Sequence, residues 1–520
     1  MRNRTVIIGS GIAGLSAAVE LSARGEEVLV LESAACVGGK MRQINIHNQH
    51  IDSGPTVLTM RWVFDAIFQA AGTRLEDHVK LKPLNILARH AWTDGSRMDL
   101  FSDIDRSADE IGRLAGPAEA RGYRDFCAKA ARVYSSLEST FINAQQPSML
   151  GLVGRMGRQK PSDIIEINPH QSLWDTLGRY FKDKRLHQLF ARYATYCGSS
   201  PYSATATLML VAHVERQGVW HIEGGMHKLA QALKNLAENA GATFRFNTQV
   251  KTITHSAGRV SGVVLEDDEE ISASSIVFNG DAAALACGLL GTASRKAVTR
   301  QSPRVRSLSA ITWSTVADPK DFPLSHHNVF FSDDYRAEFT DILTHKSFPR
   351  APTVYICAQD RANDATAAVN GQGEPTNAEP ERLLCLVNAP PVGDQKTFEE
   401  AEIKQCQDQT RSVLKRCGLD LDFPTDTTVI TTPADFEALF PGTGGALYGR
   451  HAHGMTATFQ RPGSRSKLPG LYLAGGSVHP GPGVPMAALS GRLATASLLA
   501  DRASTRRFHK AATFGGTSTA

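Results

Sequence analysis

The sequence predicts an α/β protein in which a domain built on a parallel sheet is interleaved with a second, α+β domain that carries a helical cap. Three observations predict this fold. A strand, glycine turn, helix and strand open the chain at residues 4–34, a further strand runs into glycines near residue 475, and residues 85–220 are mostly helical in pattern. With 520 residues the chain is longer than a single hydrophobic core ordinarily accommodates, which favours two domains.

The opening segment alternates as a parallel α/β unit requires. An apolar strand over residues 5–8 is followed by a glycine turn, an Ala-rich helix to about Arg24, Gly25 as its stop, and a second strand over residues 27–31. Glycines follow the first strand immediately, so we interpret this apolar stretch as a strand rather than a signal peptide.

The first turn reads Gly9-Ser10-Gly11-Ile12-Ala13-Gly14, which is the G-x-G-x-x-G pattern between a strand and a helix. Gly9 permits a tight turn, Gly11 lets the backbone approach a pyrophosphate, and Gly14 lets the helix pack on the strand. The unpaired N–H groups at the start of the following helix favour an anion. The turn therefore predicts a dinucleotide site.

Two further features extend this site. Glu32 ends the second strand, where a carboxylate would accept hydrogen bonds from both hydroxyls of an adenosine ribose and would repel the 2′-phosphate of NADP. The segment Gly38-Gly39-Lys40-Met41 allows a second close backbone approach to the pyrophosphate with a cation beside it. The turn that contains Gly54 and Pro55 follows at residues 52–56.

The C-terminal part supplies a second glycine turn. A strand at residues 470–474 runs into Gly475 and Gly476, and a segment ending in Val484-Pro485-Met486 leads into a helix predicted to run to about Leu499. Two such turns about 460 residues apart fit one long dinucleotide, and FAD rather than NAD explains both.

The remaining elements complete the predicted organisation. Short strands at residues 244–246, 251–255, 260–265 and 271–278 are interpreted as an antiparallel meander, residues 362–380 as an exposed loop, and residues 503–520 as a flexible basic tail. The predicted FAD-binding domain is discontinuous, over residues 1–80, 222–310 and 465–502. The predicted substrate and membrane-facing domain takes residues 81–221 and 311–464.

Composition excludes several classes of protein. A net charge of +4 gives no case for nucleic acid as a partner, and eight scattered cysteines without a C-x-x-C pair argue against a zinc site or a disulfide framework. The sequence contains no run of 18 apolar residues, so no transmembrane helix is predicted. Neither His479 nor the histidines at 213, 221 and 227 have ligand-like spacing, so no metal is expected, and no catalytic residue is identified.

Taken together, these motifs resemble the bacterial carotenoid desaturases related to phytoene desaturase, within the wider FAD amine oxidase and protoporphyrinogen oxidase superfamily. The run from Ala474 to Gly491 is most similar to the branch that acts on hydroxylated or methoxylated acyclic carotenoids, the hydroxyneurosporene (1-hydroxycarotenoid 3,4-) desaturases. Phytoene desaturases more often have Gly-Ala-Gly-Thr-His where this chain has Gly475-Gly476-Ser477-Val478-His479, which favours the later-pathway branch.

The resemblance implies a Rossmann-type FAD domain of the glutathione-reductase and amine-oxidase kind, with FAD bound non-covalently. It implies an adenosine end at Glu32 and at the backbone of Val250, although sequence alone interprets Val250 as a core strand residue. The cofactor-binding residues so implied are Gly9, Gly11, Ile12, Ala13, Gly14, Glu32, Gly39, Lys40, Met41, Gly54, Pro55, Val250, Gly475, Gly476, Val484, Pro485 and Met486.

The implied reaction removes a hydride to oxidised flavin and a proton from an allylic cation, so that positioning in an apolar channel does most of the catalysis. A long polyene has to be collected from a bilayer, and residues 149–160 mix apolar and basic side chains as an interfacial segment would. We therefore expect a cytoplasmic protein peripherally bound to the inner face of a bacterial membrane, with a quinone or oxygen as electron acceptor. The alternatives are a phytoene desaturase, another amine oxidase or isomerase of the superfamily, and a GDI-like lipid carrier without redox chemistry.

Overall fold

The computed structural model describes residues 4–145, 170–361 and 380–511, with side chains as far as residue 504. One lobe is built on a five-stranded sheet of order β19-β13-β1-β2-β9, in which every neighbouring pair is parallel. Its strands are β1 (Thr5–Ile8), β2 (Val28–Leu31), β9 (Thr243–Arg245), β13 (Ser275–Phe278) and β19 (Leu471–Leu473). The predicted parallel α/β domain is therefore confirmed.

Three helices pack together beside this sheet. Helix α1 (Ile12–Ser22) is buried along its whole length and contacts both α10 (His227–Asn239) and α15 (Val484–Ala511). The contact with α15 is so close that a Cβ at Gly491 would overlap the carbonyl oxygen of Ala13. The helix that follows the last glycine turn is thus held directly against the helix that follows the first.

The second lobe is built on a seven-stranded sheet of order β18-β14-β17-β16-β15-β6-β7. The pair β15 and β6 is parallel and the other pairs are antiparallel. Helix α13 (Glu400–Arg416) packs against this sheet through a core that includes Cys406 and Leu414. The strands are β6 (Ile86–Trp92), β7 (Arg97–Phe101), β14 (Ser309–Ala317), β15 (His327–Phe331), β16 (Val354–Ala358), β17 (Glu381–Ala389) and β18 (Thr428–Thr431).

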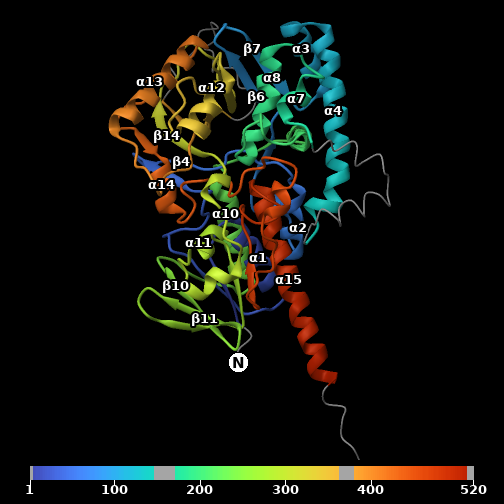
Figure 1. The fold of residues 1–520 in the computed structure, drawn as a ribbon, viewed down its shortest axis with the longest axis vertical. Coiled ribbons are helices and arrows are strands. Elements are labelled where there is room, and N and C mark those ends of the chain that lie inside the picture. Colours follow the sequence, from blue (N-terminus) through green and yellow to red (C-terminus); the bar gives the residue numbers. More distant parts are fainter. Residues whose placement is uncertain (1–3, 146–169, 362–379, 512–520) are drawn as a thin grey trace, which may run out of the picture.

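The helical cap belongs to this second lobe (Figure 1). A separate hydrophobic core joins its helices, with Phe126, Phe181 and Phe190 in mutual ring contact. Its helices are α3 (Ile104–Ala115), α4 (Pro117–Leu137), α7 (Leu173–Leu177), α8 (Lys184–Ala191) and α9 (Leu210–Arg216), with short helices at Glu138–Ile142, Arg192–Cys197 and Ala206–Met209.

Smaller strands and helices complete the two lobes. The additional strands are β3 (Gln43–Ile46), β4 (Gln49–Asp52), β5 (Leu81–Pro83), β8 (Trp220–Ile222), β10 (Val250–Ser256), β11 (Arg259–Leu265) and β12 (Glu270–Ser272). The additional α-helices are α2 (Trp62–Ala70), α11 (Ala282–Cys287), α12 (Tyr335–Thr340) and α14 (Pro433–Leu439).

The structure corrects four sequence expectations. The antiparallel meander contains β10, β11 and β12 alone, because β9 and β13, predicted as its ends, join the parallel sheet beside β2 and β1. Residues 85–220, predicted to be mostly helical, also include the strands β6 and β7, so their apolar side chains belong to a sheet and not to a helix face. Helix α15 continues past Leu499 to Ala511, since no glycine or proline stops it there, so the predicted tail from residue 503 begins as helix. Finally, β14 begins at Ser309, just before the predicted boundary at residue 310.

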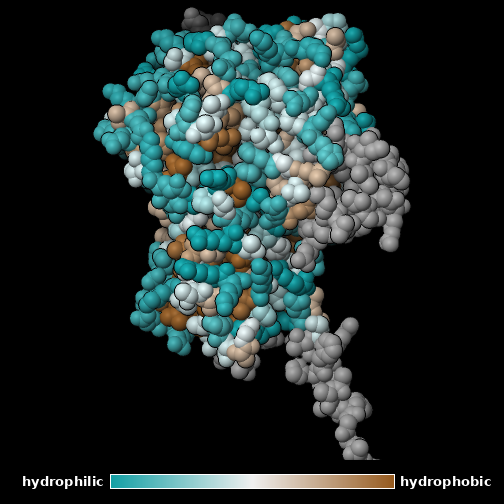
Figure 2. Space-filling view, viewed as in Figure 1, coloured by the Kyte–Doolittle hydropathy of each residue, from teal (hydrophilic) through white to brown (hydrophobic). Residues whose placement is uncertain are grey.

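Two predicted segments lie outside the described residues: the interfacial segment 149–160 and nearly all of the loop 362–380. Among the helices that the structure describes, none has the length and apolarity needed to cross a bilayer. The face drawn in Figure 2 is mostly hydrophilic, with hydrophobic residues in small separate groups.

Candidate functional site

The first glycine turn lies at the carboxyl end of β1, as predicted. Gly9 has φ +95°, and a Cβ on Gly14 would lie closer than 3.0 Å to the Gly9 carbonyl oxygen, so both positions require glycine. Helix α1 starts directly after Gly11 and has no side-chain hydrogen bond at its N-cap. Gly11 has no side chain that could cap the N–H groups of Ile12 and Ala13, which an anion could therefore reach, whereas the N–H of Gly14 donates to Asn279.

Glu32 lies at the end of β2, beside this turn. Its carboxylate accepts hydrogen bonds from the backbone N–H of Ser10 at 2.7 Å and from the Ser10 hydroxyl at 2.8 Å, and from the N–H of Ala34 at 2.9 Å. These bonds fix Glu32 against the glycine turn. Val250 begins β10, is buried, and pairs with Leu265, which agrees with its interpretation as a core residue. Binding of an adenosine ribose by Glu32 and of adenine by Val250 stays a prediction.

The second glycine segment lies against the first. The N–H of Gly38 donates to the Ser10 carbonyl at 3.0 Å, and a Cβ on Gly39 would lie 3.2 Å from the Cα of Gly11. The Lys40 ammonium donates to the Leu447 carbonyl at 2.7 Å, and burial lowers the pKa of Lys40. The structure thus brings Gly38 and Gly39 to the turn and gives Lys40 a protein partner of its own.

The turn at residues 52–56 ties this region to α10. The Asp52 carboxylate accepts the backbone N–H groups of Met226, at 2.5 Å, and His227, at 3.4 Å, at the start of α10. Burial raises the pKa of Asp52, and these hydrogen bonds oppose that rise. A Cβ on Gly54 would overlap the carbonyl group of Lys40, so the turn packs directly on the second glycine segment.

The neighbouring residues hold the same region in place. Met41 is buried, and its carbonyl accepts a hydrogen bond from Nδ1 of His227 at 2.9 Å. Gln359, which the sequence did not single out, donates to the Asp52 carbonyl at 2.8 Å and accepts from the Asp52 N–H at 2.9 Å. Gln359 reaches Asp52 only because the second lobe packs on β4, so no local sequence pattern could have revealed it.

Asn279 joins the two distant glycine turns, and it too was missed. Its Oδ1 accepts the N–H of Gly14 at 2.8 Å, and its Nδ2 donates to the Ala474 carbonyl at 3.3 Å. Because β13 lies between β1 and β19, the residue that follows β13 reaches both turns. The N–H of Gly475 in turn donates to the Ser490 hydroxyl at 2.7 Å, which fixes the last turn on α15.

An apolar cavity of about 270 Å³ begins at this last turn. Val484, Pro485 and Met486 line it, and Met455, 38% exposed, lies where it reaches the surface. Its wall is mostly aliphatic and aromatic, as a hydrocarbon ligand would require. The other lining residues are Val57, Thr59, Met60, Leu137, Phe141, Ile142, Tyr196, Cys197, Thr205, Thr207, Leu208, Leu210, Val211, Val214, Glu215, Ala452, Thr458, Phe459, Arg461, Pro480, Pro482 and Gly483.

Arg461 is a buried cation between this cavity and the last turn. Its guanidinium donates to the carbonyls of Gly476 at 3.1 Å and Tyr448 at 3.0 Å, and also to that of Arg450. Burial lowers the pKa of Arg461 to about 10. Three carbonyl oxygens from separate segments hold the side chain, so its position could not be read from its neighbours in the sequence.

The histidines have structural partners. Nε2 of His479 donates to the Ala144 carbonyl at 2.9 Å, its ring meets Phe141 edge-on at 4.9 Å, and burial lowers its pKa to about 4. His479 is therefore neutral near pH 7 and is held by the cap. Nδ1 of His213 bonds Arg216, at 3.1 Å, on the same helix.

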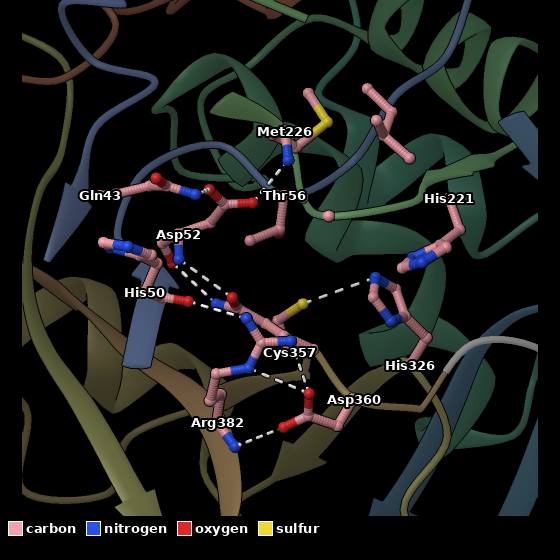
Figure 3. Close-up of a pocket in the computed structure, with 14 residues that line it drawn as sticks. Gln43, His50, Asp52, Thr56, His221, Met226, His326, Cys357, Asp360 and Arg382 are labelled. Carbon is pink, nitrogen blue, oxygen red and sulfur yellow. Dashed lines mark hydrogen bonds and ion pairs between the residues drawn. The ribbon is translucent and has the colours of Figure 1, made fainter. Parts of the chain in front are cut away.

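A second, polar pocket of about 170 Å³ lies between β4, the start of α10 and the second lobe (Figure 3). Arg382 and Asp360 form an ion pair at 2.5 Å on one side, and His221 faces His326 on the other. The remaining lining residues are Gln43, His50, Asp52, Thr56, Ile222, Gly224, Gly225, Met226, Cys357 and Gln359. The Asp52 hydrogen bonds form part of this wall.

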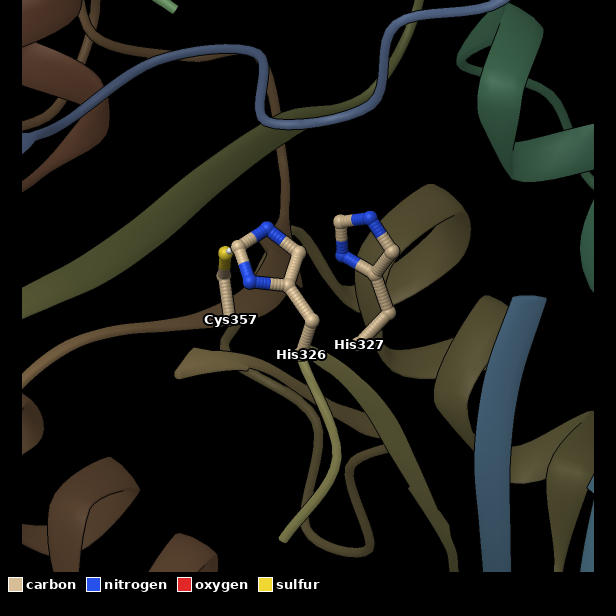
Figure 4. A group of neighbouring side chains, drawn as sticks. All are labelled: His326, His327 and Cys357. Atoms are coloured by element: carbon tan, nitrogen blue, oxygen red, sulfur yellow. Dashed lines mark hydrogen bonds between the residues drawn. The ribbon is translucent and has the colours of Figure 1, made fainter. Parts of the chain in front are cut away.

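His326, His327 and Cys357 form a buried cluster (Figure 4), of which His326 and Cys357 line the polar pocket. Their ligand atoms lie within 4.8 Å of one another, and burial lowers the pKa of both histidines. Nδ1 of His326 already bonds the Arg361 carbonyl at 2.9 Å, and Nδ1 of His327 bonds the Tyr355 hydroxyl at 2.8 Å. Nε2 of His326 also bonds Sγ of Cys357 at 3.7 Å, whereas Nε2 of His327 has no partner within the described residues. The absence of a metal stays a prediction.

Comparison with known proteins agrees with this geometry. The family model of flavin containing amine oxidoreductases matches residues 12–499. Cyclohexylamine oxidase from Brevibacterium oxydans has the same fold, with a TM-score of 0.55 and 13% identity over 97% of this chain and 100% of that chain.

Two curated relatives are much closer in sequence. A 1-hydroxycarotenoid 3,4-desaturase from a Flavobacterium species is 31% identical over 95% of this chain and 99% of its own length. A hydroxyneurosporene desaturase from Rubrivivax gelatinosus is 50% identical over 99% of this chain and 97% of its own length. The chain belongs to the flavin-containing amine oxidoreductase family and, within it, to the carotenoid desaturases.

Proposed function

We propose that this protein is an FAD-dependent desaturase that introduces the C3–C4 double bond of an acyclic 1-hydroxy or 1-methoxy carotenoid such as hydroxyneurosporene. The observation that carries the proposal is the junction at Asn279: two glycine turns meet there, and the second opens into an apolar cavity. The relatives named for this reaction support the substrate class.

The residues present fit FAD. The first two residues of α1, Ile12 and Ala13, and the backbones of Gly11 and Gly39 offer a close approach for a pyrophosphate, and Glu32 would bind the adenosine end. Gly54 and Pro55, with Gly475 and Gly476, would surround the flavin end. The cysteines of the described chain are free and none follows Gly475, which favours non-covalent binding.

The chain's own contribution to the reaction is positioning and exclusion of water. Bound FAD would supply the acceptor for the hydride that leaves the substrate. Pro485 and Met486 place the apolar cavity wall at the flavin end, so that a polyene in the cavity presents its carbon–carbon bond there. The buried guanidinium of Arg461 brings positive charge to the same end, where it would stabilise the negative charge of a reduced cofactor.

Collecting a polyene requires contact with a bilayer, so we propose that the protein binds peripherally to the inner face of a bacterial membrane and passes electrons to a quinone or oxygen. The exposed Met455 at the cavity wall is a contact of the kind that such a surface would offer.

Two experiments test the function. The purified protein should be yellow with flavin absorbance, and a colourless protein would favour a lipid carrier instead. Cells that express the chain and contain neurosporene, 1-hydroxyneurosporene or phytoene should convert 1-hydroxyneurosporene, with cells lacking the chain as the control. Conversion of phytoene alone would contradict the proposed substrate and indicate the earlier pathway step.

A further inference from the structure

The apolar cavity contains a buried charged group in its wall. Among the lining residues that the structure describes, Glu215 is the one carboxylate, and it is 2% exposed. Tyr196 lines the cavity beside it. Burying a carboxylate in the wall of a hydrocarbon site costs free energy unless the group is paired and hydrogen-bonded.

A network of charged hydrogen bonds holds these side chains. The Tyr196 hydroxyl donates to Glu215 at 2.8 Å and accepts from Arg192 at 2.7 Å, and the Tyr193 hydroxyl donates to the other Glu215 oxygen. Arg192 also pairs with Glu215 at 3.5 Å, and both side chains are buried. Burial opposes the charge of Arg192, but Tyr196 and Glu215 outweigh burial and raise its pKa.

The network retains hydrogen-bonding capacity. A phenol oxygen has two lone pairs and a carboxylate has about four, and the bonds above use one lone pair on Tyr196 and one on each Glu215 oxygen. Nε and Nη2 of the buried Arg192 have no hydrogen-bond partner within the described residues. Arg192 does not line the cavity itself, so the wall offers the accepting oxygens of Tyr196 and Glu215, which a ligand hydroxyl that donates would match.

This part of the wall is also connected to the flavin end of the site. The short helix that holds Tyr196 ends at Gly198, where a Cβ would lie 2.5 Å from the ring of Tyr448. Gly449, which follows Tyr448, packs against Ser477 of the last glycine turn, where a Cβ on Gly449 would lie 2.7 Å from the Ser477 Cβ. In a 1-hydroxy carotenoid the oxygen is three covalent bonds from C3, so the group that binds it must lie close to the reacting bond.

From these observations we infer that Tyr196 and Glu215, held by Arg192, form a subsite for the tertiary hydroxyl group of a 1-hydroxy carotenoid. The inference rests on the proposed function and narrows it. The substrate hydroxyl donates to the Glu215 carboxylate, whereas a 1-methoxy group and a hydrocarbon end group have no proton to donate. The subsite therefore selects the hydroxylated substrate over the methoxylated one and over a hydrocarbon end group.

The test compares three substrates in liposomes: 1-hydroxyneurosporene, 1-methoxyneurosporene and neurosporene. For the wild-type protein, kcat/KM should be highest for 1-hydroxyneurosporene. Tyr196→Phe and Glu215→Gln should each lower kcat/KM for 1-hydroxyneurosporene by roughly 10- to 100-fold, the range for a buried hydrogen bond to a charged group. Their kcat/KM for neurosporene should change by less than about threefold, because that substrate makes no such bond.

Tyr134→Phe is the matched control, because the Tyr134 hydroxyl donates to Glu138 at 2.9 Å outside the cavity wall. This variant should keep the wild-type selectivity. The subsite is wrong if both cavity variants keep it too, or if wild-type protein converts the methoxy compound as well as the hydroxy compound, a result that needs no variant. Wild-type protein that converts none of the three carotenoids contradicts the proposed function itself.

Discussion

Replacing Gly14 by alanine should destabilise the whole first lobe. The new Cβ would lie closer than 3.0 Å to the Gly9 carbonyl oxygen and 2.8 Å from Oδ1 of Asn279, which accepts the Gly14 N–H. Neither neighbour is a flexible side-chain end, since one is backbone and the other is fixed at Ala474. Overpacking costs about 1–3 kcal/mol and a strained hydrogen bond about 1 kcal/mol, so we expect a loss of about 2–4 kcal/mol.

The assay is urea unfolding followed by circular dichroism, together with the flavin content of the purified protein. The matched control is Gly112→Ala in α3, where a Cβ would meet the Ala120 side chain at an ordinary 3.6 Å. Since alanine favours a helix interior over glycine by about 0.5–1 kcal/mol, this variant should be as stable as wild type or more stable. The two substitutions make the same chemical change, yet Gly14→Ala should lower the free energy of unfolding and Gly112→Ala should not.

Gly14→Ala protein with wild-type stability and wild-type flavin content would refute this reasoning, because the helix would then have room to move from β1. Equal losses for both variants would also refute it, since the loss would then arise from the helix backbone and not from the close contact with Gly9.

Three further changes test other parts of the site. Asp52→Asn should weaken FAD binding about tenfold or more, because it removes the charged acceptor of the Met226 N–H that holds the turn with Gly54 and Pro55 in place. Titration of the apoprotein with FAD measures the Kd, and an unchanged Kd would contradict this prediction. Arg461→Gln should lower the flavin midpoint potential by roughly 30 mV, equivalent to about 1.4 kcal/mol, in a spectroelectrochemical titration; an unchanged potential would place the guanidinium away from the flavin. Burial raises the pKa of Glu338 from 4.5 to about 6, so its stabilising contribution, complete below pH 4.5, is lost as pH rises through 6. Relative to Glu338→Gln, wild-type protein should lose about 2 kcal/mol of unfolding free energy over that range, and parallel stability curves would contradict the shift.

Contiguous sequence accounts for the local parts of the fold. The strand at residues 5–8, the turn from Gly9 to Gly14 and the start of α1 lie where the glycine spacing predicts them, because a tight turn and a close helix contact are properties of adjacent residues. The last turn is likewise readable, since a strand, two glycines and a helix follow one another within residues 471–484.

Strand partners were less predictable. The pattern of β13 does not distinguish a strand that pairs with β12 from one that pairs with β1, because it is buried throughout. The long-range sheet order decides between them, and that order depends on residues more than 200 positions apart.

The sequence by itself determined that this protein has a dinucleotide fold with two glycine turns, and its resemblance to carotenoid desaturases gave the substrate class. Only the tertiary structure decided that Asn279 joins the two turns, that Arg461 lies between the last turn and the cavity, and that Tyr196 and Glu215 share the cavity wall. The physical reason is that turns and helix starts depend on neighbouring residues, whereas a cavity wall and a buried hydrogen-bond network depend on side chains from segments that meet only when the chain has folded.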